Sequence, residues 1–242
     1  MALGTRRRVH RAHCVPIAPF QWQGSWLSYT QFDAGGKMIT AVNTTWTVPN
    51  KPKSSFGSNA PGWWFGIQTA KGDGALIQPI LAWGYQGSEY SIFNACFDWT
   101  DGSWHTSPEV YTVPAGDTIT SSVTYIGDRT YQMYIASAQT GKSVTTNYKL
   151  EEAQTEVESI AYFVLEHQPD WCSAYPSDGV CTFENVQVAV EGKTVESPTW
   201  TSHQEQPKCN SKATVVDPHT LKFTWDAGSD AQVAPKKWGY GQ

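Results

Sequence analysis

The sequence has few charged residues and no long apolar run. Asp, Glu, Lys and Arg make up 16% of the 242 residues, and the formal net charge is −5. No apolar stretch is long enough to cross a membrane as a helix. The mildly acidic balance also argues against a general nucleic-acid-binding protein, which would carry a basic face. We therefore expect neither a membrane nor a nucleic acid as partner.

Several common catalytic and metal-binding motifs are absent. The chain has no G-x-S-x-G, no H-E-x-x-H and no Gly-rich loop that would hold a phosphate. Its five cysteines show no paired C-x-x-C spacing of the kind that binds zinc. We therefore expect no metal and no cofactor, and any chemistry has to come from ordinary side chains.

The cysteines that are present point to an oxidising compartment. Cys172 and Cys181 bracket the turn signal Pro-Ser-Asp-Gly, so we take them as a candidate disulfide. The odd total leaves at least one cysteine unpaired or paired between chains. The segment NTT makes Asn43 a candidate N-glycosylation site in a secreted protein. Together these features favour secretion, although no signal peptide is visible.

The two ends of the chain differ from its middle. Residues 1–23 contain a basic run and prolines, without an apolar segment behind the basic run, and we interpret them as a solvated arm. The alternative is a nuclear-localisation or nucleic-acid patch. Residues 227–242 form a predicted C-terminal arm. Residues 24–226 then make up one domain, which is large enough to bury a stable core without disulfide bonds or metal ions.

The middle of the chain is rich in aromatic residues and in strand-like runs. It draws on 12 Trp, 11 Tyr and 9 Phe, and short alternating or apolar runs recur between turn residues. This pattern predicts an antiparallel all-β sandwich or barrel. The weak helix candidate is 151–160. The expected strands are 40–49, 63–68, 75–83, 90–99, 117–126, 129–138, 158–167, 182–192 and 219–226.

Three of these strands direct a polar side chain along one face. Alternation puts Glu166 on the face of the apolar side chains of its strand, and Gln78 on the corresponding face of its own. Asp98 lies on the face opposite Phe97 and Trp99. We expect these polar groups to converge.

A glutamate beside a glutamine is a minimal device for hydrolysis. The carboxyl group can take a proton from water and later return it to a leaving group. The neutral amide of Gln78 can stabilise the oxyanion that forms when water adds to a carbonyl. The alternative is that Glu166 and Gln78 are strand residues satisfied by backbone or water. Asp98 and Glu166 could also form a glycosidase pair, which needs a spacing of roughly 5–9.5 Å between the carboxyl groups.

The order and the amino-acid sequences of several segments resemble those of the eqolisins, a family of glutamic peptidases. The similarity covers roughly residues 40–192 and continues more loosely to about 226. The matching segments are WTVP (46–49), WFGIQ (64–68), ALIQ (75–78), NACFDW (94–99), PAGDTITSSV (114–123), TGKSVT (140–145), AYFVLE (161–166) and FENVQVAV (183–190).

The resemblance implies a β-sandwich of two bent antiparallel sheets with the substrate cleft on the concave face. It implies a monomeric endopeptidase that cuts polypeptides at acidic pH, with Gln78 and Glu166 as the catalytic pair. Trp64 then lies at the mouth of the site, and Asp98 and Trp99 line the cleft. Residues 1–23 are interpreted as a possible remnant of a cleavable pro-segment.

The sequence departs from the family pattern at two acidic positions. Gln68, a further candidate for substrate binding, stands where relatives usually carry Asp, and the Asp expected shortly after the catalytic Gln is missing. His105 and His167 lie near the matched strands. Alternation directs His167 to the face opposite Glu166, which favours a surface or packing role.

A different class of function fits the same fold. A non-catalytic sandwich could bind carbohydrate or peptide with a platform of tryptophans. The alternative for most of these tryptophans is packing in the core and at its rim. The candidates are Trp63, Trp64, Trp83, Trp99 and Trp104. The peptidase hypothesis requires Gln78 and Glu166 to share an open cleft.

Overall fold

The chain folds into two antiparallel β-sheets. The computed structural model describes residues 15–16, 26–53, 61–72, 74–100, 102–166 and 171–229. Within them, the first sheet has nine strands and the second has eight. The elements other than strands are two short 3₁₀ turns, η1 (Cys172–Ala174) and η2 (Lys208–Asn210). The predicted all-β sandwich is thereby confirmed.

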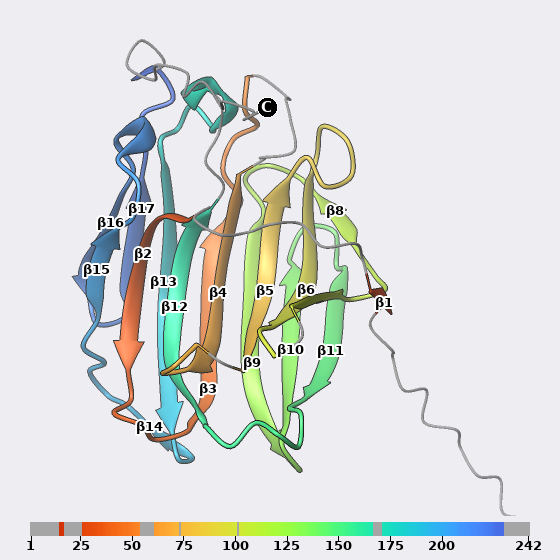
Figure 1. Cartoon of the computed structure of the whole chain (residues 1–242). Helices are drawn as coiled ribbons and strands as arrows, with labels where there is room; N and C mark the ends of the chain where they lie inside the picture. Colours follow the sequence, from red (N-terminus) through yellow and green to blue (C-terminus); the bar gives the residue numbers. More distant parts are fainter. Residues whose placement is uncertain are drawn as a thin grey trace, which may run out of the picture.

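The nine-stranded sheet carries the strands that matter most for the site. Figure 1 shows its central strands side by side. In spatial order the strands are β1 (Val15–Pro16), β7 (Ser103–Thr106), β6 (Tyr90–Asp98), β5 (Ala75–Trp83), β4 (Gly62–Thr69), β12 (Glu158–Glu166), β2 (Trp26–Asp33) and β15 (Thr201–Gln204), with β8 (Tyr111–Val113) paired to β6.

The eight-stranded sheet packs against one face of the first sheet. In spatial order its strands are β11 (Ser143–Lys149), β10 (Thr130–Ser137), β9 (Thr118–Gly127), β3 (Ile39–Thr47), β13 (Val180–Val190), β17 (Thr220–Thr224) and β16 (Lys212–Asp217), with β14 (Lys193–Thr194) paired to β13. Strand β5 has the bounds that the sequence predicts. Residues 151–157 contain turns and bends instead of the weakly expected helix, and β12 begins at Glu158.

The main core lies between the two sheets and is built largely of aromatic rings. Phe163 of β12 stacks on Phe65 of β4 with ring centroids 5.2 Å apart, and meets Phe183 of β13 edge-on at 4.9 Å. Trp46 of β3 packs on the same Phe183 ring. Truncating a buried ring of this kind typically costs about 3–5 kcal/mol.

Polar side chains connect the sheets at one end of this core. The Asn94 side-chain amide of β6 donates to the backbone oxygens of Met133 and Val144, each at 3.2 Å. The Tyr148 hydroxyl of β11 donates to Asp98 at 2.9 Å. These bonds satisfy groups that would otherwise be costly to bury.

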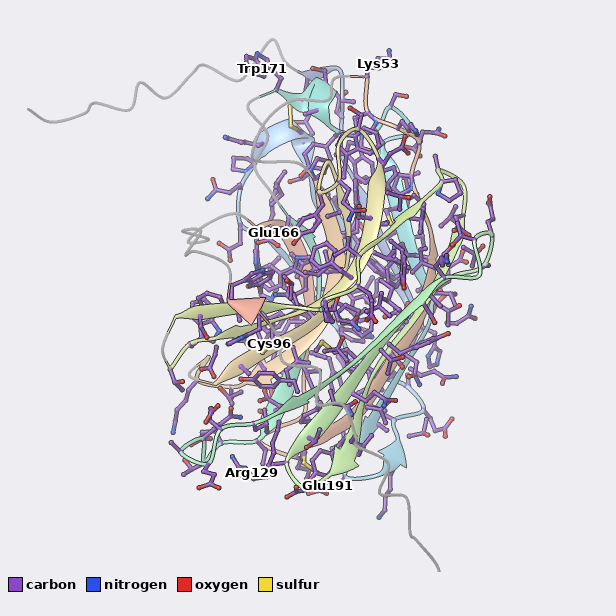
Figure 2. The ribbon with its side chains drawn as sticks, turned by 90° about the vertical axis from the view of Figure 1, so that its right-hand side faces the viewer. Lys53, Cys96, Arg129, Glu166, Trp171 and Glu191 are labelled. Atoms are coloured by element: carbon purple, nitrogen blue, oxygen red, sulfur yellow. A yellow bond between two sulfur atoms is a disulfide. The ribbon has the colours of Figure 1, made fainter. Side chains whose placement is uncertain are left out.

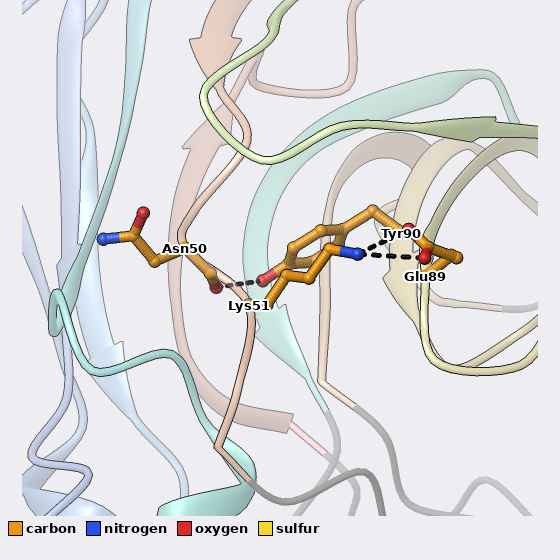
Figure 3. Close-up of polar contacts among 4 residues, drawn as sticks. All are labelled: Asn50, Lys51, Glu89 and Tyr90. Atoms are coloured by element: carbon orange, nitrogen blue, oxygen red, sulfur yellow. Dashed lines mark hydrogen bonds and ion pairs between the residues drawn. The ribbon is translucent and has the colours of Figure 1, made fainter.

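The chain after β3 is tied to the start of β6. The Tyr90 hydroxyl donates to the Asn50 backbone oxygen at 2.9 Å, and the Lys51 ammonium group pairs with the Glu89 carboxylate at 2.9 Å (Figure 3). The ion pair is exposed and contributes little to stability, because solvent screens it.

The described residues include no helix long and apolar enough to cross a membrane.

The predicted Cys172–Cys181 disulfide is wrong. Cys172 of η1 is bonded to Cys209 of η2, 37 residues away along the chain, with Cα atoms 5.3 Å apart. Cys181 lies in β13 opposite Phe223, and burial raises the pKa of its thiol. The turn signal correctly marks a turn, but η1 points Cys172 towards a partner that local sequence does not reveal.

The remaining expectations about segments fall on different parts of the structure. Apart from β1 and residues 227–229, the predicted arms lie outside the described residues, as does His167. Asn43 lies in the middle of β3, half-buried and paired with Gln187 and Ser122. Its glycosylation stays a prediction.

We predict that replacing both Cys172 and Cys209 by serine lowers the free energy of unfolding by about 2–4 kcal/mol, because the bond restricts a long loop of the unfolded chain. Denaturant titration of the variant measures this. Cys181→Ala is the control, since it removes a buried thiol and leaves the disulfide intact. Peptide mapping without reductant that finds Cys172 bonded to Cys181 would contradict the assignment.

We also predict loss of stability at alkaline pH. Burial raises the pKa of Tyr90, Tyr131 and Tyr148 above the usual value, with neighbouring acidic groups adding to the effect. Their contribution is fully present below about pH 10 and is lost as the pH rises further, since the unfolded phenols ionise first. Phenolate absorbance and circular dichroism should change together. If all tyrosines ionise, as judged by phenolate absorbance, while the circular dichroism spectrum stays native, the predicted loss of stability is contradicted.

Candidate active site

Three neighbouring strands of the nine-stranded sheet carry the candidate catalytic residues. β4 lies between β5 and β12, so Gln78 of β5 and Glu166 of β12 are separated by one strand. Val164 pairs with Trp64, and Trp64 pairs with Ile80. Trp64 therefore occupies the strip of sheet between the two candidate residues.

Side-chain alternation divides these strands between two apolar clusters. Trp63, Phe65 and Phe163 enter the core between the sheets. Their neighbours along the strands face the other side of the nine-stranded sheet and form a second cluster, which we call the outer cluster. Its buried members are Trp64, Leu76, Ile80, Ala82, Phe93, Ala95 and Val164.

A cavity of about 390 Å³ opens on the face of the outer cluster. Both Gln78 and Glu166 line it, so the two residues share one cavity as the peptidase hypothesis requires. Figure 2, turned by 90° from Figure 1, labels Glu166 among the side chains of this region. The full lining is Trp26, Trp64, Leu76, Gln78, Phe97, Trp99, Trp104, Glu166, Glu205 and Gln206.

The Glu166 side chain is held by a neighbour on the adjacent strand. The Trp64 indole N–H donates to Glu166 Oε2 at 2.6 Å. Glu166 is 8% exposed, and this bond fixes the orientation of its carboxyl group at the cavity wall. The Tyr175 hydroxyl donates to the Glu166 backbone oxygen at 3.0 Å and anchors the end of β12. Burial, and then the Glu166 charge, raise the pKa of Tyr175, which keeps it a neutral donor.

Gln78 is buried at the floor of the cavity. It is 2% exposed, and its Oε1 atom accepts no hydrogen bond from the residues that the structure describes. A buried acceptor without a partner costs free energy.

Asp98 lies on the other side of the sheet. It accepts hydrogen bonds from Tyr148, at 2.9 Å, and from the Thr100 backbone and hydroxyl, at 2.8 and 2.6 Å. It is 4% exposed and does not line the cavity. Its expected place in the cleft is therefore not where the structure puts it, because Phe97 and Trp99 on either side of it take the cavity face.

Gln68 also lies away from the cavity. It follows Trp64 by four residues on the same face, near the end of β4, and is not among the lining residues. Its side-chain nitrogen packs beside Gly72, in the turn after the strand. His105 lies on β7, where its Nε2 atom is 2.6 Å from the Ser103 hydroxyl.

The tryptophans of the predicted platform are divided between two places. Trp63 and Trp83 are buried in the main core. Trp64, Trp99 and Trp104 line the cavity, and Trp99 is 44% exposed. Three of the five predicted tryptophans therefore contribute to an aromatic rim of the cavity.

Three of the lining residues lie in segments where the sequence offered no candidate site residue. Trp26 starts β2 and meets Trp64 edge-on, with ring centroids 5.3 Å apart. Glu205 and Gln206 follow the exposed edge strand β15 and are held by hydrogen bonds from their backbone N–H groups to the Leu27 oxygen, at 2.9 and 3.1 Å. Burial, and then Glu205, raise the pKa of Tyr29. The short polar run containing Glu205 has no pattern that would mark it as part of a site.

Comparison with known proteins identifies the family. The family model "Peptidase A4 family" matches residues 21–223. The chain belongs to this family. The expected resemblance to the eqolisins is thus confirmed. Within the described residues, no three His, Cys, Asp or Glu side chains lie where they would hold a metal ion.

Individual relatives within the family are distant. The chain is 26% identical to scytalidopepsin B of Scytalidium lignicola over 186 residues, which are 73% of this chain and 66% of that relative. The fold is similar to that of scytalido-glutamic peptidase solved with a peptide-based transition state analog, with a TM-score of 0.58 and 18% identity over 85% of this chain and 100% of the other. Aspergilloglutamic peptidase from Aspergillus niger gives a TM-score of 0.51 and 19% identity, over 69% and 99% of the two chains.

We predict that Trp64→Phe costs more stability at neutral pH than Trp63→Phe, its neighbour in β4. Both changes replace a buried indole by a smaller phenyl ring. Only the Trp64 indole donates to a carboxyl group, and such hydrogen bonds are worth about 1.5–3 kcal/mol. The Trp63 indole nitrogen has no hydrogen-bond partner among the described residues, so it serves as the matched control. Denaturant titration gives both values, and equal losses would contradict the role of the indole N–H.

Proposed function

We propose that the protein is a glutamic endopeptidase that acts at acidic pH on unfolded or extended polypeptides. The observation that carries this proposal is the presence of Glu166 and Gln78 in one cavity, with the indole of Trp64 fixing the carboxyl group. Family membership and the similarity to scytalidopepsin B support the same class of reaction. The expectation of an acidic pH rests on the resemblance to the eqolisins.

In this proposal Glu166 first acts as a general base. Its carboxylate takes a proton from a water molecule as the water oxygen bonds to the carbonyl carbon of the substrate. The carbonyl oxygen becomes an oxyanion, and the side-chain N–H of Gln78 donates to it. The buried position of Gln78 strengthens this interaction, because little solvent competes for the amide.

Glu166 then acts as a general acid. The proton that it accepted passes to the amide nitrogen, the C–N bond breaks, and the oxyanion returns its electron pair to form a carboxylic acid. No group outside the chain and the attacking water is needed. The aromatic walls of the cavity provide apolar surface against which an extended peptide can pack.

The disulfide and the origin of the site residues bear on localisation and assembly. The Cys172–Cys209 disulfide supports an oxidising compartment, and with it the proposal that the protein is secreted. We propose that it acts as a monomer, since one chain supplies both Glu166 and Gln78 to the same cavity.

We predict that the wild-type protein digests a denatured, alkylated protein somewhere between about pH 2 and 7. Glu166→Gln should abolish cleavage, because glutamine cannot take a proton from water. Gln78→Ala should lower kcat by about 10²–10³, the loss seen when one oxyanion donor is removed. New N-termini measured over time give the rates.

The control for this experiment is Glu109→Gln, which removes an exposed carboxyl group between β7 and β8 that does not line the cavity. Undiminished cleavage by Glu166→Gln would eliminate the proposed mechanism. If wild type cleaves nothing at any pH, the aromatic rim of Trp64, Trp99 and Trp104 would instead favour a binding protein, which a glycan array tests next.

A further inference from the structure

The strand that carries Gln78 contains a proline at its next residue. Pro79 lies in the middle of β5, which is a central strand paired on both sides. Proline is normally confined to sheet edges or bulges, because it has no N–H to donate to a neighbouring strand. A proline in this position therefore weakens the sheet where the candidate amide is held.

The ladder hydrogen bond that Pro79 cannot donate would go to β4. Trp83 of β5 donates its backbone N–H to the Pro61 oxygen on the β4 side, at 2.9 Å. Because alternate residues of a strand point the same way, the backbone of Pro79 also faces β4, opposite Phe65. On the other side, Asn94 directs its backbone N–H to Ser107 and away from Pro79, which agrees with this orientation.

The pairing of β4 with β5 is interrupted opposite Pro79, where the missing N–H predicts an interruption. It runs from Gly62 opposite Ala82 to Trp64 opposite Ile80, and resumes at Ile67 opposite Ile77. Between these points, Phe65 and Gly66 form no pair with β5. Both missing pairs require an N–H on Pro79, so this one residue accounts for the gap.

Gly66 fills the gap with the smallest possible residue. A Cβ atom added to Gly66 would lie 2.7 Å from the Ile77 backbone oxygen and 3.1 Å from Gln78 Cβ. On the opposite side, Gln78 pairs with Ala95 of β6. The Gln78 side chain therefore rises between two neighbours that carry almost no side chain, and the backbones of β4 and β5 approach more closely than a Cβ would allow.

We propose that Pro79 and Gly66 are positioning residues for Gln78. Pro79 leaves one ladder bond between β5 and β4 unmade without changing their register, and Gly66 allows the two backbones to approach closely beside Gln78. Together they place the Gln78 amide at the floor of the cavity. This inference rests on the proposed function, in which an amide aligned to within about 0.5 Å is needed for the oxyanion.

The test is Pro79→Ala, which supplies the missing N–H opposite Phe65. The additional ladder bond to Phe65 should then shift the Gln78 amide, and kcat should fall about tenfold, a part of the 10²–10³ expected for complete loss of such a donor. KM should stay within about twofold, since the aromatic walls that bind substrate are unchanged. Both constants are measured on the denatured, alkylated protein, with circular dichroism confirming the fold.

A double variant separates positioning from a general structural effect. If Pro79 acts through Gln78, then Gln78→Ala with Pro79→Ala should be no slower than Gln78→Ala alone. Gly66→Ala should lower kcat in the same direction. Pro114→Ala is the matched control, because it removes a half-buried proline from a turn outside the cavity and should leave kcat unchanged.

An unchanged kcat in Pro79→Ala would overturn the inference, as would effects of Pro79→Ala and Gln78→Ala that multiply in the double variant. A rise in KM with constant kcat would overturn it too, because that pattern marks substrate binding. These outcomes differ from failure of the proposed function itself, in which Glu166→Gln retains activity.

Discussion

The site depends on the alternation of side chains along three neighbouring strands whose side chains are buried on both faces of the sheet. In β4, β5 and β12 one set of side chains fills the core between the sheets, and the other set forms the outer cluster and the cavity. This constraint puts Glu166, Trp64 and Gln78 on the same side. A slip of one residue in any of these strands would exchange the two sets and remove a polar group from the cavity.

The same constraint explains how polar groups are tolerated in so apolar a place. Glu166 is oriented by an indole N–H from the next strand and is anchored at its backbone by Tyr175. Gln78 keeps an acceptor without a partner among the described residues. Local rules are broken beside it, with Pro79 in a central strand, and such exceptions are expected where a structure serves a function. The disulfide joins η1, which follows Glu166 in the chain, to η2, which follows Gln206.

Much of this could be predicted from sequence, because strand alternation is a local property. It gave the bounds of β5 and the faces of Gln78 and Glu166, and it already placed Asp98 opposite Phe97. The resemblance to a family then assigned Asp98 to the cleft, against that alternation, and the structure follows the alternation. The partners of Cys172 and Glu166 depend on contacts between distant segments, which no local pattern encodes. The place of Glu205 in the cavity lining, after the edge strand β15, depends on such distant contacts too.

The central claim is that Glu166 and Gln78 act together on one tetrahedral centre. The most direct measurement is the affinity of a peptide-based transition state analogue for the wild-type protein and for Glu166→Gln and Gln78→Ala, by titration calorimetry at acidic pH. Groups that stabilise the transition state should matter for the analogue and little for a matched peptide without the tetrahedral group. The account predicts that each variant loses about 10²-fold or more in affinity for the analogue alone. Equal affinity of all three proteins for the analogue would contradict it.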